Sequence, residues 1–199
     1  YNGIIICKKR KNLRGKGGAP VRLLFALELP PSMIETLTEL QRRLLGIGIG
    51  GRAISQENFR MLFQVGGEVT EDDAQALIHK LETDLAVLPS PVLQIVGVGA
   101  LVRSGGDNVY AQLGGDTEML YRLKNDIGRS IDELGLALDL KPFAPNITIL
   151  HGCRFGNPKL RVRSNSFFLS HLALYMSQPT MFRDPYPDYE RIWEIPFMR

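Results

Sequence analysis

Cysteine, histidine and long apolar runs are all scarce in this chain of 199 residues. The two cysteines, Cys7 and Cys153, lie far apart, which excludes a disulfide framework and a cysteine-based zinc site. No stretch approaches the roughly 20 apolar residues that a membrane helix needs, and residues 21–29, the best of them, contain Arg22 and Glu28. Residues 1–7 show no signal-peptide pattern. We therefore expect a protein that uses no membrane, metal or cofactor and works in a reducing, cytoplasmic setting.

The net charge of +3 is divided unevenly along the chain. Residues 1–20 carry six basic side chains and no acidic one, whereas the remaining 179 residues carry 18 basic and 21 acidic side chains, a net charge of −3. A short basic arm can bind phosphate backbones, but a Gly- and Lys-rich terminus is more simply solvated and mobile. We expect residues 1–20 to be a flexible leader and the mildly acidic remainder to form the folded body.

The apolar pattern of that body predicts helices and strands of the α+β class. The strands and helices alternate without the strict rhythm of a doubly wound sheet, which favours α+β. Ser32, Thr70 and Thr117 are the expected N-caps of the three helices. We expect helices over 32–45, 70–85 and 117–134, strands over 21–29, 93–102, 109–113, 146–150, 167–177 and 189–197, one or two strands over 52–65, and loops over 156–165 and 178–187.

A faint internal repeat links two segments that lie about 85 residues apart. Residues 57–63 (ENFRMLF) and 143–149 (FAPNITI) each open a short strand with a polar residue that is followed by apolar alternation. Such a pair is what two related halves of one body would show.

Several short pieces, taken in order, resemble the two-histidine (2H) phosphoesterases, in particular the LigT-like 2′-5′ RNA ligases and RNA 2′,3′-cyclic phosphodiesterases. They are the Pro-Pro after the opening strand, LQRRL at 40–44, ENF at 57–59, GGEV at 66–69, KPFAP at 141–145, LALYMS at 172–177 and YERI at 189–192. The resemblance covers about residues 21–197. It implies that residues 21–199 form one two-lobed, pseudo-symmetric domain, with antiparallel sheets around a central cleft and helices on the outside.

The resemblance also locates two catalytic motifs, and this chain departs from both. The family carries one His-x-Thr-x motif on each lobe, in which the imidazoles act as general base and general acid and the threonines hold phosphate oxygens. Here the first motif reads Arg60 to Phe63, with Leu62 in place of threonine. The second reads Asn146 to Ile149 and keeps Thr148. No histidine lies between residues 21 and 78, so a shifted alignment does not restore the first motif.

These replacements remove proton transfer but leave phosphate-binding groups. Arginine has a pKa above 12 and cannot act as a base near neutral pH, and asparagine does not titrate. Losing one acid–base group typically removes about 10²–10⁴ in rate. However, Arg60 presents a planar set of donors suited to phosphate, and Asn146 and Thr148 can also donate. We therefore expect Arg60, Asn146 and Thr148 to bind phosphate.

His151 is the histidine nearest to the second motif. Residues 146, 148 and 150 share one strand face, so His151 reaches the cleft only if the strand ends or bulges near Leu150, which Gly152 would permit. We expect His79 to be exposed on its helix and His171 to be a packed or surface residue.

Three interpretations remain open from the sequence. In the first, the protein is catalytically degenerate and binds a phosphate, a nucleotide or an RNA end in the cleft between the lobes. In the second, it is an active RNA 2′,3′-cyclic phosphodiesterase or 2′-5′ RNA ligase that uses other groups, such as His151 and Arg60. In the third, it is a scaffold or regulatory protein with no ligand in the cleft. The sequence identifies no protein partner.

Overall fold

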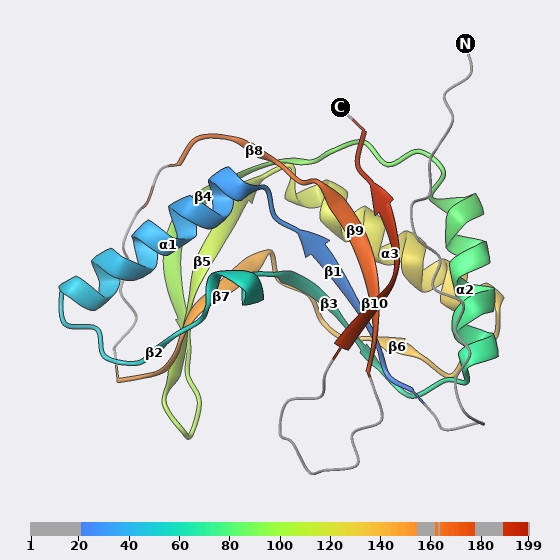
Figure 1. The fold of residues 1–199 in the computed structure, drawn as a ribbon, viewed down its shortest axis with the longest axis horizontal. Helices are drawn as coiled ribbons and strands as arrows, with labels where there is room; N and C mark the ends of the chain where they lie inside the picture. The colour runs from blue at the N-terminus through green and yellow to red at the C-terminus, as the bar shows by residue number, and fades with distance from the viewer. Residues whose placement is uncertain (1–20, 155–161, 163, 178–188, 199) are drawn as a thin grey trace.

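Two five-stranded antiparallel sheets form the framework of the molecule (Figure 1). The structure is a computed structural model, and it describes residues 21–154, 162, 164–177 and 189–198. The first sheet has the order β10 (Tyr189–Pro196), β9 (His171–Ser177), β1 (Leu23–Glu28), β3 (Met61–Gly66) and β6 (Asp139–Leu140). The second has the order β2 (Arg52–Ala53), β7 (Asn146–Cys153), β5 (Asp107–Gly115), β4 (Val92–Leu101) and β8 (Phe167–Phe168). This is the expected α+β class.

Three α-helices lie outside the sheets. In Figure 1, α1 (Pro31–Gly46) lies beside the second sheet and packs against β7. The other two, α2 (Glu71–Asp84) and α3 (Thr117–Glu133), pack against each other on the side of the first sheet. A 3-10 turn, η1 (Gln56–Asn58), precedes β3. Each sheet therefore has one face turned toward helices and one face left for the site.

Alternation along β1 shows how the two faces differ. Leu23, Phe25 and Leu27 are at most 2% exposed and belong to the main core with the helix side chains. The opposite face carries Ala26, which packs with Ala173 and Tyr175 in a small separate cluster. Small side chains on this second face leave space in front of the sheet.

Several expectations from the sequence are confirmed and others are wrong. Thr70 caps α2 in a full capping box with Asp73. Ser32 does not cap α1, because that helix begins at Pro31 and its N-cap is Pro30. Thr117 is the first residue of α3, and the N-cap residue Asp116 uses its carboxylate to accept the Val92 N–H instead.

The strand expected over 167–177 is wrong in one respect, because it is divided between the two sheets. β8 pairs with β4 in the second sheet, whereas β9 pairs with β1 in the first. The chain crosses at Ser170, whose backbone N–H and hydroxyl both donate to the Glu28 carbonyl. The leader over 1–20, the loop over 178–187 and most of the loop over 156–165 lie outside the described residues.

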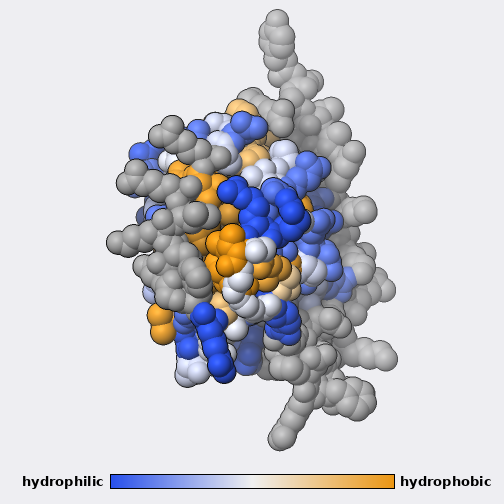
Figure 2. All heavy atoms as spheres, turned by 90° about the vertical axis from the view of Figure 1, so that its left-hand side faces the viewer, coloured by the Kyte–Doolittle hydropathy of each residue, from blue (hydrophilic) through white to orange (hydrophobic). Residues whose placement is uncertain are grey.

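Apolar side chains are exposed where α1 ends. Leu45 and Ile47 are 39% and 67% exposed, and α1 ends at the left of Figure 1. Figure 2 faces that side and shows hydrophobic and hydrophilic surface beside each other.

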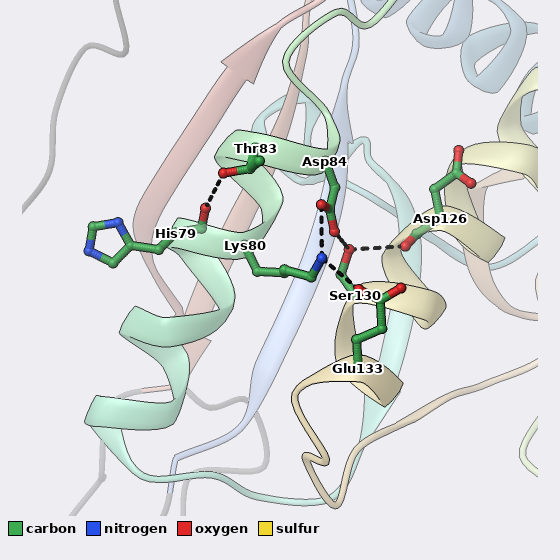
Figure 3. Close-up of polar contacts among 7 residues, drawn as sticks. All are labelled: His79, Lys80, Thr83, Asp84, Asp126, Ser130 and Glu133. Carbon is green, nitrogen blue, oxygen red and sulfur yellow. Dashed lines mark hydrogen bonds and ion pairs between the residues drawn. The ribbon is translucent and has the colours of Figure 1, made fainter.

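A polar cluster joins α2 to α3 (Figure 3). Lys80 Nζ lies 3.0 Å from Asp84 Oδ1 and 2.6 Å from Glu133 Oε2. The Ser130 hydroxyl donates to Asp84 Oδ2 at 2.6 Å, and Ser130 is only 1% exposed. This hydrogen bond and the Lys80 ammonium lower the pKa of Asp84. The folded state therefore favours ionised Asp84.

Replacing Ser130 should show how much its hydrogen bond to Asp84 contributes to stability. We expect Ser130→Ala to reduce the free energy of unfolding by about 1–2 kcal/mol near neutral pH, because a buried charge-assisted hydrogen bond is lost. The contribution from the lowered Asp84 pKa is complete above the ordinary aspartate value and is lost as pH falls through the folded-state pKa. Urea denaturation at several pH values should show the two proteins converging in acid, with Thr36→Ala, an exposed helical hydroxyl, as the matched control. An acid-independent difference would contradict this account.

Candidate functional site

A cleft with a volume of about 640 Å³ lies between the two sheets. β3 contributes Leu62 and Gln64, whereas β5 and β7 contribute residues from the other side. The structure brings together the four motif positions and the histidine that follows the second motif, although they come from segments far apart in the chain. They are Arg60, Leu62, Asn146, Thr148 and His151.

His151 reaches the cleft through a bulge in β7. Tyr110 pairs with Thr148 and the preceding residue of β5, Val109, pairs with Leu150, so Ile149 is an extra residue on β7. Ile149 and Leu150 are both fully buried, and alternation resumes after them with the opposite phase. As a result, the face that carries Asn146 and Thr148 continues with His151 rather than Leu150. The required bulge lies one residue earlier than the sequence suggested.

Gln41 of α1 holds this bulge in place. Its Nε2 donates to the Ile149 carbonyl at 2.7 Å and to the Ile54 carbonyl at 2.9 Å. The Ile54 N–H also donates to the Ile149 carbonyl. Gln41 is 8% exposed and lies among the apolar side chains of its helix. Its only signal in the sequence is a polar residue on an apolar stripe, which the sequence analysis missed.

His151 is set up to be neutral near pH 7. Its Nδ1 lies 2.8 Å from Asn108 Oδ1, and since that oxygen can only accept, Nδ1–H donates and Nε2 keeps the lone pair. Burial, and then the positive charge of Arg52, lower the pKa of His151 below its usual value. The imidazole therefore offers an acceptor nitrogen rather than a positive charge.

Arg60 is held by neutral groups of the first sheet. Its guanidinium carbon lies 5.0 Å from the centre of the Tyr175 ring, and Nη2 donates to the Glu57 carbonyl at 3.3 Å. Tyr175 is 7% exposed and its hydroxyl donates to Glu28 Oε1 at 2.6 Å. Burial, with that hydrogen bond, raises the pKa of Tyr175 to about 12, so the ring stays uncharged. The stack orients Arg60 without neutralising it.

The three remaining motif positions differ in polarity and in their contacts. The side chains of Asn146 and Thr148 are half-buried and form no hydrogen bond with any residue that the structure describes. Leu62 packs against the cluster of Ala26, Ala173 and Tyr175. The cleft wall therefore has two uncommitted polar groups on β7 and an apolar surface on β3.

Sequence reasoning missed Arg103 and Tyr110, which also line the cleft. Arg103 follows β4 and is exposed, and its guanidinium forms no hydrogen bond or ion pair with the described part of the chain. Tyr110 lies over Gly99, where a Cβ atom would come within 2.5 Å of the phenol. That close approach gives Gly99 a specific role in a strand and could have indicated a packed aromatic side chain.

The other histidines lie elsewhere. His79 on α2 has a side chain that is 56% exposed, as expected. His171 on β9 pairs with Glu28 of β1 and is half-buried. Over the described ranges, no three His, Cys, Asp or Glu side chains are grouped to hold a metal ion, and no helix has the length and apolar character to cross a membrane.

Comparison with known proteins finds the same architecture among solved structures. No family model matches the sequence, and no curated protein matches it. A crystal structure of E. coli LigT complexed with 3′-AMP has a TM-score of 0.69 at 22% identity and covers 91% of this chain and 100% of its own. TT0787 of Thermus thermophilus has a TM-score of 0.63 at 22% identity, over 88% of this chain and 97% of its own. A structure described as a phosphoesterase has a TM-score of 0.68 at 22% identity, over 90% and 100%.

These likenesses establish the class of fold. The chain has a two-lobed α+β architecture with a central cleft. More particularly, this is the LigT-like fold, as the ordered sequence pieces indicated.

Removing the Gln41 amide should disturb the bulge. We expect Gln41→Leu to lower the free energy of unfolding by about 1–3 kcal/mol, because the buried Ile149 carbonyl and the partly buried Ile54 carbonyl each lose a donor. The amide NMR signals of residues 149–151 should shift as well. Gln94→Leu, at an exposed position of β4, is the matched control and should do neither. Unchanged stability and spectra in Gln41→Leu would show that the bulge holds without this residue.

The protonation of His151 can be measured directly. Histidine NMR titration should place its midpoint below 6.5, with the neutral imidazole favoured above that midpoint. Arg52→Gln removes a nearby positive charge and should raise the pKa, because the imidazolium is then less strongly opposed. Lys124→Gln, on α3, serves as a charge-matched control. A midpoint at or above 6.5 in the native protein would contradict the burial argument.

Proposed function

We propose that this protein binds a phosphate-bearing ligand, a nucleotide or an RNA end, in the cleft between the lobes, and that it has lost the paired-histidine reaction. The observation that carries the proposal is the cleft lining. Arg60, Asn146 and Thr148 meet there with donors that no described residue uses fully, and both motif histidines are replaced. Guanidinium, amide and hydroxyl donors together suit phosphate oxygens.

The solved structures of the same fold support this ligand class. The E. coli LigT crystal structures include complexes with 3′-AMP, with phosphate, with ATP and with NADP⁺. All of these ligands carry phosphate. Because identity to LigT is 20–22%, the argument for this chain comes from its own donors, and LigT supplies a precedent for the ligand class.

Two assays test the proposal. Inorganic phosphate and 3′-AMP should raise the melting temperature of the native protein, because a ligand that binds only the folded state must stabilise it. Arg60→Ala should weaken binding by about tenfold or more, since a charge-assisted contact to phosphate is lost. Arg42→Ala, on the exposed face of α1, should leave binding unchanged. Absence of stabilisation by either ligand would instead support a scaffold with no cleft ligand.

The loss of catalysis needs its own measurement. A short RNA that ends in a 2′,3′-cyclic phosphate should remain intact when it is incubated with a high concentration of the native protein. Mass spectrometry of the RNA measures this. A variant with Arg60→His, Leu62→Thr and Asn146→His restores the residue types of both motifs, and it should open the ring. Thr148→Ala added to that variant should reduce the gained turnover, because it removes a phosphate-binding hydroxyl.

A second candidate function has a specific observation in its favour. The β7 bulge brings His151 into the cleft as a neutral imidazole with a free acceptor nitrogen, which is what a general base requires. An RNA cyclic phosphodiesterase that uses this single histidine would show native ring opening that His151→Gln abolishes. Native turnover that survives His151→Gln would exclude this candidate.

A further inference from the structure

The described residues that line the cleft carry charge of one sign. Among them, Arg60 and Arg103 are permanently charged and none is Asp or Glu. The chain outside residues 1–20 has a net charge of −3, so this is not an average property of the body. Two other cavities among the described residues each include two carboxylates, Asp132 and Asp139 in one and Asp84 and Asp126 in the other.

Neither arginine is neutralised by a direct ion pair with a described residue. Arg60 contacts an uncharged ring and a carbonyl. The nearest carboxylate along that stack, Glu28, accepts a hydrogen bond from the hydroxyl of Tyr175 and is not among the lining residues. The side chain of Arg103 has no hydrogen-bond or ion-pair partner among the described residues. The cleft therefore presents close to two positive charges while His151 is neutral.

Charge distinguishes the two forms of phosphate, monoester and diester, that an RNA end or a nucleotide can carry. A terminal phosphate monoester has a second pKa near 6 and is largely a dianion at about pH 7.5, whereas a cyclic or internal phosphodiester carries one negative charge. An additional ligand charge gains Coulomb energy from both guanidiniums, and no lining carboxylate opposes it. A fixed Arg60 also serves bound phosphate well, but it cannot exchange the proton that opening a cyclic diester requires.

We propose that the cleft selects the dianionic phosphate monoester of a nucleotide or RNA end over the cyclic or internal diester. This inference rests on the proposed function and names its ligand class. The protein would then act after a reaction that hydrolyses a phosphodiester and leaves a terminal phosphate monoester.

The experiment compares two ligands that share one nucleoside. Isothermal titration calorimetry of the full chain with 3′-AMP and with 2′,3′-cyclic AMP compares two ligands that differ only at the phosphate. Mass spectrometry of the recovered ligand shows whether it stayed intact. At about pH 7.5 we expect 3′-AMP to bind at least about tenfold more tightly. At about pH 5 the monoester is mostly a monoanion, and the ratio should approach one.

The ratio of the two affinities, that of 3′-AMP to that of 2′,3′-cyclic AMP, separates the effect of ligand charge from the effect of protein charge. The charged or ionisable side chains among the described residues of the cleft are Arg60, Arg103, Tyr110 and His151. Of these, His151 gains a proton in acid and would strengthen binding of both ligands. Arg60→Gln and Arg103→Gln should each reduce the ratio at about pH 7.5, while Arg42→Gln should leave it unchanged. Circular dichroism confirms that each variant is folded.

The outcomes separate this inference from the proposed function. Equal binding of the two ligands, or tighter binding of the cyclic one, overturns the selectivity and leaves phosphate binding intact. A ratio that does not fall toward one in acid also overturns it, because ligand charge would then not be the cause. Failure of both ligands to bind overturns the selectivity together with the proposed function.

Discussion

The Ile149 carbonyl is the point on which the arrangement of the cleft depends. It accepts from the Ile54 N–H and from Gln41, so one oxygen joins α1, the chain beyond β2 and the bulged strand β7. The Ile54 N–H continues the pairing of β2 with β7, and Gln41 adds a second donor from the helix. The bulge held in this way turns His151 toward the same space as Thr148 and Asn146.

The two sheets form their sides of the cleft in different ways. On the second sheet, a bulge changes which side chains face inward. On the first sheet, alternation along β1 is regular, and residue size is decisive: Ala26 and Ala173 are small, and Tyr175 packs beside them with its ring open to stacking by Arg60. An arginine held this way loses little freedom on binding an anion, since its side chain is already ordered.

Much of the fold could be predicted from the sequence, and the exceptions have physical reasons. Periodicity located the three helices and the β4–β5 hairpin, and the Thr70 capping box follows from local chemistry. Periodicity cannot show that apolar residues 167–177 belong to two sheets, because Phe167 and Leu172 are both buried, each in its own sheet. Nor can it find β6, whose two residues pair with β3 only through the tertiary fold.

The candidate site was predictable where it rests on motif positions and hidden where it rests on tertiary contacts. Arg60, Leu62, Asn146 and Thr148 follow from the ordered resemblance. His151 depended on a bulge that strand alternation alone argues against, and Gln41, Asn108 and Arg103 lie in other elements with no shared sequence pattern. Their roles come from chain segments that meet only after folding.

Glu28 links the segment at which the chain crosses from the second sheet to the first with Arg60 in the cleft. Its backbone carbonyl holds Ser170 at the crossing from β8 to β9, and its carboxylate holds the hydroxyl of Tyr175, the ring on which Arg60 stacks. A rotation of one lobe against the other would bend the chain at this crossing. The same residue orients the ring under the guanidinium, so a change in the angle between the two sheets would also move Arg60.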